Sequence, residues 1–225
     1  MIKLENVEVM GWEHAIRGMR NAMNSWEKSD STASTQAVEE GWFDIGPNDY
    51  DLMTRLRNAG TDHRKFMRMI TVYLDITAPL YWWKEFDTYK VGTVANSCST
   101  MHKIHAKELT MEDFSTEHLY PEVREAFENI IIKYLNEARK TYNFLSDTPS
   151  KKDAWWQMIQ LLPTSYNQKR TVMLNYEVLA NIYKSRKAHK LDEWVEFCKW
   201  IETLPYSELI TGQSLKEKGD ERGIE

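Results

Sequence analysis

The chain has 225 residues, enough for one ordinary domain with a sizeable buried core. It carries 29 basic and 34 acidic side chains, and a net charge of −5 argues against a generally basic protein that coats nucleic acid. Hydrophobic residues make up 42% of the chain and aromatic residues 12%, which excludes an intrinsically disordered protein. Cys98 and Cys198 are too few for a disulfide framework and suit a reducing cytoplasm, although two thiols could still pair.

The sequence has no stretch that approaches the run of about 20 apolar residues needed to span a membrane. Its first residues, Met1 to Glu5, alternate apolar and charged side chains, which predicts a half-buried strand. They lack the apolar segment and small-residue cleavage site of a signal peptide. We therefore expect a soluble, cytoplasmic protein that contacts no membrane.

A helix is predicted after Gly11, where apolar side chains recur at helical spacing in Trp12, Ile16, Met19 and Met23. A Ser/Thr-rich stretch, Ser29 to Thr35, then predicts a flexible loop. Asn48 is a suitable cap for a helix that starts at Asp49 and ends before Gly60.

The middle of the chain predicts a strand that leads directly into a helix. Ile70 to Ile76 is β-branched and partly alternating, and Pro79 can occupy the first turn of a helix that carries Leu80 to Phe86. The longest helix is expected from Pro121 to Leu145, and the turn Pro149 to Lys152 should end it. The apolar face of that helix would comprise Val123, Ala126, Phe127, Ile130, Tyr134, Ala138 and Tyr142.

The C-terminal third predicts a short helix over Ala154 to Leu161, a strand at Thr171 to Leu174 and a helix from Asn175 to Ser185. One more amphipathic helix should bury Trp194, Phe197, Cys198 and Ile201. We expect a single domain over residues 1–212 and a flexible charged tail over 213–225, with Ser214 to Glu225 lacking any apolar period. The predicted fold class is α/β, with a small central sheet flanked by several helices.

Familiar catalytic motifs are absent from the sequence. It contains no GxGxxG, P-loop, HExxH, GxSxG or CxxC pattern. His102 and His105 share the spacing of a metal-binding pair, but no third ligand is suggested nearby, so we predict no metal site. The pairs Trp82–Trp83 and Trp155–Trp156 could stack on a flat ring such as a base or a flavin, yet packing in the core is the favoured interpretation.

Asn175 and Arg186 lie about three helical turns apart, so they share one helix face and could serve a pocket. The spacing alone favours a simpler interpretation, in which Asn175 caps the helix and Arg186 stabilises the negative end of its dipole.

Two blocks of the sequence carry a more specific pattern. In the first, His63 opens a short helix, Ile70 to Ile76 forms a strand, Ala78-Pro79 starts the next helix, and Asn96-Ser97-Cys98-Ser99 follows. The second block keeps its spacing without a gap and comprises Leu162-Pro163, Lys169, Asn175, Asn181 and Arg186. Together these blocks resemble the flavin-dependent thymidylate synthases.

The Arg-His-Arg marker of that family is eroded in this chain. Thr88-Tyr89-Lys90 stands in its place, and Glu85 stands where the family has a glutamine. Thr93 takes the place of the first serine, Ser99 that of the second with a one-residue insertion, and Thr100 or Met101 that of the last arginine. In the second block, Glu177 replaces the arginine of an Asn-x-Arg motif that contacts the flavin phosphates in the family.

The resemblance implies a homotetramer whose sites are shared between subunits, and it implies roles for twelve residues. Arg186 would be catalytic by polarising a pyrimidine. The substrate-binding residues would be Glu85, Thr88, Asn96, Ser99, Lys169 and Arg186, and the residues that bind FAD would be His63, Lys65, Tyr89, Lys90, Asn175 and Asn181.

The implied reaction is transfer of a one-carbon unit from methylenetetrahydrofolate to C5 of dUMP or a related pyrimidine deoxynucleotide, with reduced FAD as hydride donor and NADPH as co-substrate. The loss of a guanidinium at Thr88 should weaken binding of ordinary dUMP, and Glu85 could accept a cytosine amino group instead. Nucleic acid is not expected as a partner. The alternative is a non-catalytic protein on the same fold that binds a nucleotide or a partner and has lost flavin chemistry. A third possibility is a purely structural helical protein.

Overall fold

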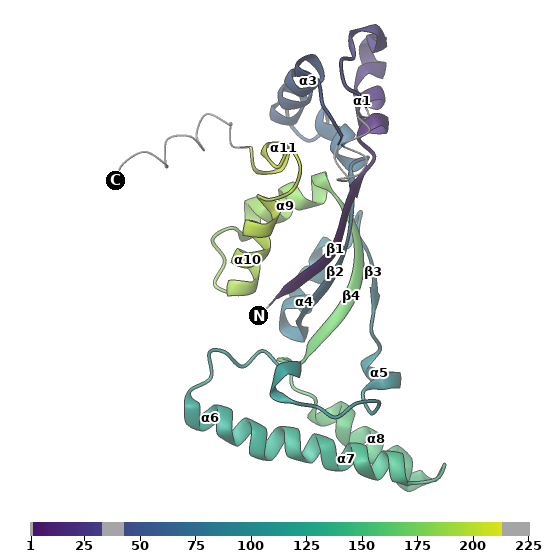
Figure 1. Cartoon of the computed structure of the whole chain (residues 1–225), viewed down its shortest axis with the longest axis vertical. Helices are drawn as coiled ribbons and strands as arrows, with labels where there is room; N and C mark the ends of the chain where they lie inside the picture. Colours follow the sequence, from purple (N-terminus) through teal and green to yellow (C-terminus); the bar gives the residue numbers. More distant parts are fainter. Residues whose placement is uncertain (1, 33–42, 213–225) are drawn as a thin grey trace. The chain divides into compact units, whose positions relative to one another are not determined.

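The computed structural model describes residues 2–32 and 43–212 (Figure 1). It is a mixed α/β structure built on a four-stranded antiparallel sheet with the strand order β1-β2-β4-β3, which confirms the predicted fold class. The strands are β1 (Lys3–Met10), β2 (Thr71–Pro79), β3 (Val94–Ser97) and β4 (Asn167–Asn175). The α-helices are α1 (Trp12–Arg20), α3 (Pro47–Asn58), α4 (Leu80–Phe86), α5 (Thr100–Lys103), α6 (Pro121–Ala126), α7 (Lys133–Phe144), α8 (Pro149–Leu161), α9 (Tyr176–Arg186), α10 (Asp192–Ile201) and α11 (Glu208–Thr211).

Short helical segments complete the described chain. The 3-10 segments are η1 (Asn21–Met23), η2 (Trp26–Lys28), η3 (Arg64–Arg68), η4 (Asp87–Tyr89) and η5 (Met111–Asp113), whereas η6 (Phe127–Ile132) is π-helical. Among the described residues, no helix combines the length and the apolar character that a membrane crossing requires.

Backbone contacts divide the chain into two compact units. The first contains Ile76–Thr88 and Asn96–Thr171. The second contains Leu4–Asp75, Tyr89–Ala95 and the described residues from Val172 onward. The central strands β2 and β4 are the most buried of the sheet, as their β-branched and leucine side chains predict.

The core of the first unit is apolar and is closed by a buried amide. Its fully buried members are Ile104, Leu109, Phe114, Ile132, Leu135 and Met158. Asn136 on α7 accepts a hydrogen bond from the backbone N–H of Leu109 (2.9 Å) and donates one to its carbonyl (2.8 Å). One side chain therefore satisfies both backbone groups of a residue that would otherwise be buried without partners. Trp82 and Trp83 are also fully buried, which confirms their interpretation as core residues.

The predicted long helix from Pro121 to Leu145 is helical but not uniform. Its central turn is the π-helix η6, between α6 and α7. A π-turn closes its hydrogen bonds over five residues rather than four. Of the predicted apolar face, Phe127, Ala138 and Tyr142 pack against the core of the first unit. Ile130 and Tyr134 were expected to be inward but are 51% and 62% exposed, and Ile132 and Leu135 are buried instead.

The segment from Pro149 to Lys152 was predicted as a turn and is in fact the first turn of α8. Pro149 occupies the first helical position, where the absence of an N–H costs nothing. The side chain of Thr148 accepts a hydrogen bond from the N–H of Lys151, which caps the helix. The helix predicted over Ala154 to Leu161 therefore begins one turn earlier than its apolar residues indicate.

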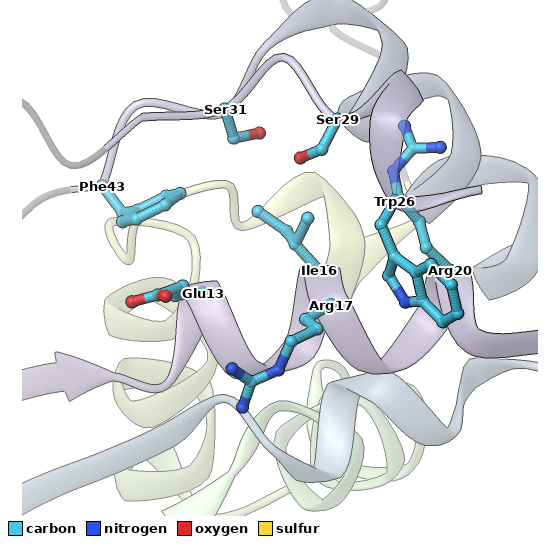
Figure 2. A pocket seen from close by; sticks show the side chains of 8 residues that line it. All are labelled: Glu13, Ile16, Arg17, Arg20, Trp26, Ser29, Ser31 and Phe43. Atoms are coloured by element: carbon cyan, nitrogen blue, oxygen red, sulfur yellow. The ribbon is translucent and has the colours of Figure 1, made fainter. Parts of the chain in front are cut away.

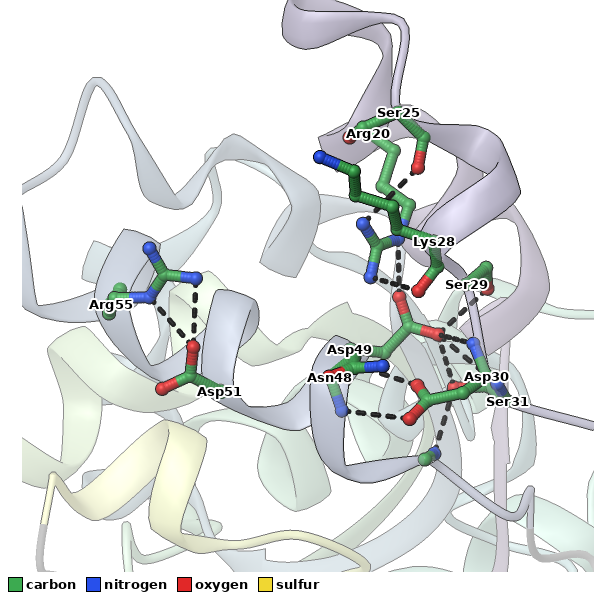
Figure 3. A network of polar contacts seen from close by, with 11 residues as sticks. Arg20, Ser25, Lys28, Ser29, Asp30, Ser31, Asn48, Asp49, Asp51 and Arg55 are labelled. Atoms are coloured by element: carbon green, nitrogen blue, oxygen red, sulfur yellow. Dashed lines mark hydrogen bonds and ion pairs between the residues drawn. The ribbon is translucent and has the colours of Figure 1, made fainter.

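A buried ion pair anchors the second unit (Figure 3). Arg20 at the end of α1 donates from Nε to Asp49 Oδ1 on α3 at 2.6 Å, and both side chains are almost completely buried. The other carboxylate oxygen of Asp49 accepts hydrogen bonds from the hydroxyls of Ser29 and Ser31 and from the N–H groups of Asp30 and Ser31. Asp49 thereby joins α1, α3 and the segment between them.

The cap of α3 differs from the prediction. Gly46 is the N-cap, Pro47 is the first helical residue and Asn48 lies inside the helix. The carboxylate of Asp30 accepts the N–H groups of Asn48 and Asp49 at 2.9 and 3.1 Å. Asp30 therefore accepts, at the positive end of α3, the N–H groups that the side chain of Asn48 was expected to cap.

The predictions for the last third of the chain are largely confirmed. A strand, β4, runs into α9 at Asn175, and α10 buries Trp194, Phe197, Cys198 and Ile201. The predicted tail from Ser214 to Glu225 lies outside the described residues, as does part of the predicted loop from Ser29 to Thr35.

Candidate functional site

Helix α9 and its N-cap carry three of the residues that the sequence singles out, Asn175, Asn181 and Arg186, and Asn175 fixes the start of the helix. Asn175 is the N-cap, and its side-chain oxygen accepts the N–H of Val178 at 3.0 Å. Gly92 lies against the same amide with a φ of 80°, and a Cβ at Gly92 would come within 3.1 Å of Asn175 Nδ2. Glycine at this position therefore allows the segment around residue 92 to approach Asn175 closely. The capping role predicted for Asn175 is confirmed. Its Nδ2 donates to the carbonyl of Gly92 at 3.5 Å.

Arg186 lies in the last turn of α9, where its charge opposes the negative end of the helix dipole as expected. Its Nε donates to the hydroxyl of Tyr89 at 2.9 Å, and Nη1 lies 2.9 Å from Nε2 of His189. The guanidinium also lies 4.9 Å from the ring centroid of Trp194, a cation–π contact. Arg186 and Tyr89, which the sequence predicts for one site, are therefore in direct contact.

Glu177 is the residue that departs from the expected Asn-x-Arg motif, and the structure pairs it with a cation. Arg64 Nε on η3 lies 2.8 Å from Glu177 Oε2, and the two side chains are only 19% and 7% exposed. The N–H is poorly aligned with that oxygen, so the contact is an ion pair rather than a well-directed hydrogen bond. Arg64 Nη2 also donates to Asn181 Oδ1 at 3.2 Å.

Sequence reasoning missed Arg64, although it identified both of its neighbours. His63 and Lys65 are exposed beside it, at the start of η3. Lys90 is also exposed, next to the half-buried Tyr89. The only available signal for Arg64 was its position in a basic run, because its pairing with Glu177 depends on how η3 packs against α9.

The residues predicted to bind substrate lie in the first unit, with the exception of Arg186. Glu85 is half-buried on α4, and its backbone carbonyl accepts the hydroxyl of Thr88 at 2.8 Å. Asn96 is exposed on β3. Ser99 caps α5, because its hydroxyl accepts the N–H of His102 at 3.0 Å. Lys169 is half-buried on β4, and its carbonyl accepts the N–H of Cys98, which ties the end of β3 to β4.

Arg170 is a second cation that the sequence analysis did not select. Its Nη1 donates to Asp87 at 3.0 Å, its Nε donates to Gln168, and its guanidinium lies 4.2 Å from the ring centroid of Trp83. Asp87 directly precedes Thr88, which stands where the family has an arginine, so the guanidinium of Arg170 binds next to that position. The sequence showed two adjacent cations, Lys169 and Arg170. It did not show which of them would contact the residues around position 88.

A small pocket of about 200 Å³ lies elsewhere in the second unit (Figure 2). Ile16, Trp26 and Phe43 provide its apolar wall, and Glu13 and Arg17 from α1 line it as well. Its remaining polar groups, on Arg20, Ser29 and Ser31, are already committed to Asp49. Because pockets for nucleotide-sized ligands measure about 300–1,000 Å³, this pocket is too small to be the nucleotide site.

Among solved structures, the chain is similar to the thymidylate synthase ThyX of Helicobacter pylori. One structure of that enzyme, with FAD and dUMP, superposes with a TM-score of 0.68 at 16% identity and covers 94% of this chain and 98% of that one. A second, also with FAD and dUMP, gives a TM-score of 0.62 at 18% identity, with 92% and 98% covered. This chain has the fold of a flavin-dependent thymidylate synthase. The similarity of sequence is too low to show more than the fold. No model of a protein family matches the sequence, and no curated protein sequence matches it.

Proposed function

We propose that this chain is a flavin-dependent protein of the thymidylate synthase type, which acts at C5 of a pyrimidine deoxynucleotide. The observation that carries the proposal is the arrangement of Arg186. It lies at the end of α9 at the spacing expected from Asn175 and Asn181, and Tyr89 and Trp194 hold its guanidinium in place. The shared fold over nearly the whole chain supports the same reaction class.

In this proposal Arg186 binds a carbonyl oxygen of the pyrimidine and stabilises negative charge on the ring. A guanidinium that is already oriented by a hydrogen bond and by ring contact loses little conformational freedom when the nucleotide binds. Stabilisation of charge that develops during the reaction is the largest contribution that such a preorganised donor makes. Arg186 would therefore act on the reacting ring rather than on the phosphate.

The donor set in the second unit fits an anionic cofactor. His63, Arg64 and Lys65 form a run of basic side chains at the start of η3, and Glu177 opposite is already neutralised by Arg64. The carboxylate at 177 therefore presents no uncompensated negative charge to a diphosphate. We propose that His63, Lys65, Tyr89, Lys90, Asn175 and Asn181 hold FAD with the help of Arg64. Reduced FAD supplies a hydride when it is bound.

The substrate side of the proposal rests on the first unit. Glu85, Thr88, Asn96, Ser99 and Lys169 would contact the nucleotide together with Arg186. Thr88 lacks the charge and the fork geometry of an arginine, so ordinary dUMP should bind less tightly than a substrate that offers a donor to Glu85. Methylenetetrahydrofolate and NADPH as co-substrates, and a homotetramer that shares its sites, are parts of the same proposal.

The test is an absorbance spectrum of the purified protein over the flavin bands, before and after FAD is added, followed by titration with dUMP and with dCMP. We expect a flavin spectrum that one of the two nucleotides perturbs. Arg186→Lys should retain the flavin spectrum but lose most of the nucleotide response, because lysine keeps the charge and loses the fork. Arg55→Lys, on the exposed face of α3, is the matched control and should behave as the wild type.

Two positions favour the alternative of a binding protein without flavin chemistry. Glu177 and Thr88 stand where the family has arginines and supply no positive charge there. Glu177 is ion-paired with Arg64, and Thr88 donates its hydroxyl to the backbone carbonyl of Glu85. Protein that takes up no FAD under any condition, yet binds dUMP or dCMP by calorimetry, would establish that alternative and refute catalysis through flavin.

A further inference from the structure

The first unit contains an open groove that none of the predicted site residues lines. It has a volume of about 640 Å³, within the range of small-molecule sites. Three elements form it: α5, the end of α7 with the segment that follows, and the first turns of α8. The lining residues are Met101, His102, Tyr142, Asp147, Lys151, Lys152 and Trp155.

The charges that line this groove favour an anion. Lys151 and Lys152 lie in the first turn of α8, where the helix dipole is positive and where acidic residues are usually found. The first turn of this helix contains no acidic residue. Two cations at the positive end of a thirteen-residue helix repel the dipole unless an anion compensates them.

Asp147 contributes the opposing charge, and it does not cancel both lysines. Within the described part of the chain, neither Lys151 nor Lys152 forms an ion pair with Asp147. Lys151 instead lies with Nζ 4.8 Å from the ring centroid of Tyr142, a cation–π contact that holds it at the wall of the groove. The groove therefore keeps a net positive charge.

The walls of the groove are aromatic, and one ring is fixed in position. Trp155 donates from its indole N–H to the carbonyl of Met101 at 2.9 Å, which joins α8 to α5. Trp155 and Tyr142 also pack against the core of the first unit, so their rings are held rigidly. Rigid aromatic walls next to a cationic end suit a ligand that combines a planar ring with a phosphate.

The position of α5 connects this groove to the substrate half of the proposed site. Ser99, which the proposal assigns to the nucleotide, caps α5 through His102, and His102 lines the groove. The arginine that ends the family's motif is represented here by Thr100 or Met101, neither of which is charged. The groove therefore lies next to a part of the chain that the proposal assigns to the nucleotide.

We infer that this groove is an additional binding site for a nucleoside monophosphate, besides the one assigned to Arg186, with Lys151 and Lys152 on the phosphate and the Tyr142–Trp155 wall beside the base. The choice of a nucleotide rests on the proposed function, whereas the preference for an anion rests on the groove alone. Neither lysine belongs to the residues assigned to FAD or to the pyrimidine ring.

The experiment monitors the groove directly, by fluorine NMR of the full chain labelled with 5-fluorotryptophan. The chain has nine tryptophans, and Trp155→Phe identifies the resonance of residue 155. We expect dUMP to shift that resonance in a saturable manner. The double variant Lys151→Ala/Lys152→Ala should weaken this binding by about tenfold or more, because each lysine makes a charge-assisted contact to the phosphate.

Matched controls separate charge at the groove from charge in general. Lys133→Ala removes an exposed lysine from α7 outside the groove and should leave the titration unchanged. Deoxyuridine should bind much more weakly than dUMP, and so should inorganic phosphate. Thermal melting of each variant verifies that it is folded, and Lys152→Glu provides a second variant at a side chain that is exposed.

Three results would overturn the inference. One is the absence of any saturable shift of the Trp155 resonance with dUMP, and another is a shift that the double variant leaves unchanged. The third is equal affinity for dUMP and for either deoxyuridine or inorganic phosphate, which would refute a nucleotide site. Failure of the proposed function is seen separately, because it appears in the flavin spectrum and in Arg186→Lys rather than in the resonance of Trp155.

Discussion

The guanidinium of Arg64 lies 2.8 Å from the carboxylate of Glu177, and this pair decides the charge of the surface at the start of α9. Glu177 lies in the first turn of α9, and only 7% of its side chain is exposed. A buried carboxylate without a cation would be strongly unfavourable. The substitution that removes an arginine from the expected motif is thus accompanied by an arginine that comes from another part of the chain.

Removal of Arg64 should destabilise the fold more than its place in the short segment η3 indicates. Arg64→Ala leaves the carboxylate of Glu177 buried and unpaired, which costs about 3–5 kcal/mol. Glu177→Gln in the same chain should recover much of that loss, because a neutral amide needs no counter-charge. Urea denaturation of the single and double variants measures both effects.

The exposed pair of Arg55 and Asp51 provides the control for that experiment. Both side chains are about two thirds exposed, at 67% and 65%, and their Nη2–Oδ2 distance is also 2.8 Å. Arg55→Ala should cost less than about 1 kcal/mol, because exposed ion pairs contribute little. Equal losses for Arg64→Ala and Arg55→Ala would contradict the role assigned to burial.

Asp49 should make the stability of the protein depend on acidic pH. Burial raises the pKa of Asp49, but hydrogen bonds from Ser31, Ser29 and Arg20 outweigh it and hold the pKa below the usual value. A lowered pKa in the folded state means that the ionised carboxylate contributes stability above the unfolded pKa of about 3.9. That contribution is lost as the pH falls through the folded pKa.

The measurement is the free energy of unfolding of the wild type and of Asp49→Asn between neutral and acidic pH. The variant should be less stable at pH 7 by about 3–5 kcal/mol, since it leaves Arg20 buried without its counter-ion. The difference between the two proteins should shrink on acidification below about pH 4, where Asp49 of the unfolded wild type begins to be protonated while the folded carboxylate is still ionised. A difference that is constant with pH would refute the ionised state of Asp49.

Tyr89 should matter to nucleotide binding through Arg186. Tyr89→Phe removes the hydroxyl that accepts from Arg186 Nε at 2.9 Å and keeps the ring that packs at 5.9 Å against Trp194. A lost hydrogen bond to a charged group corresponds to about 1.5–3 kcal/mol, so the affinity for dUMP should fall by roughly tenfold or more. Calorimetric titration measures this change.

Tyr134→Phe is the matched control, because it removes the same hydroxyl from a side chain that is 62% exposed on α7. It should bind dUMP as the wild type does. If Tyr89→Phe also bound dUMP unchanged, the tether would have no part in orienting Arg186, and the proposed role of Tyr89 would be lost.

The two cysteines should react very differently with alkylating reagents. Burial, together with the nearby carboxylate of Glu202, raises the pKa of Cys198 to about 12, so its thiol stays protonated and unreactive near neutral pH. Cys98 is exposed. Iodoacetamide should modify Cys98 in the folded protein and Cys198 only after denaturation, as peptide mass spectrometry would show. Rapid modification of Cys198 in the native protein would contradict its burial on α10.

Local patterns in the sequence predicted the elements that carry strong periodic or capping signals. Asn175 was predicted to cap α9 because its side chain can reach the N–H three residues ahead, and it does. Trp194, Phe197, Cys198 and Ile201 were predicted to face the core because they recur at helical spacing, and all four are buried. Both signals are contained in a few neighbouring residues, so they needed no knowledge of the rest of the chain.

Contacts between distant residues were decided by the tertiary structure. The core of the first unit buries Ile132 and Leu135 in place of Ile130 and Tyr134, which periodicity over one helix could not reveal. Asp30 caps α3 from outside the helix, in place of Asn48. From the sequence alone, Glu177 indicates the loss of a cofactor contact. In the structure, Arg64 on η3 forms an ion pair with Glu177. The sequence by itself determined which side chains this protein has that could bind an anion and a pyrimidine. Only the packing of separate elements decided which of these charges are neutralised and which remain available to a ligand. The reason is that the energy of a charge depends on its neighbours in space.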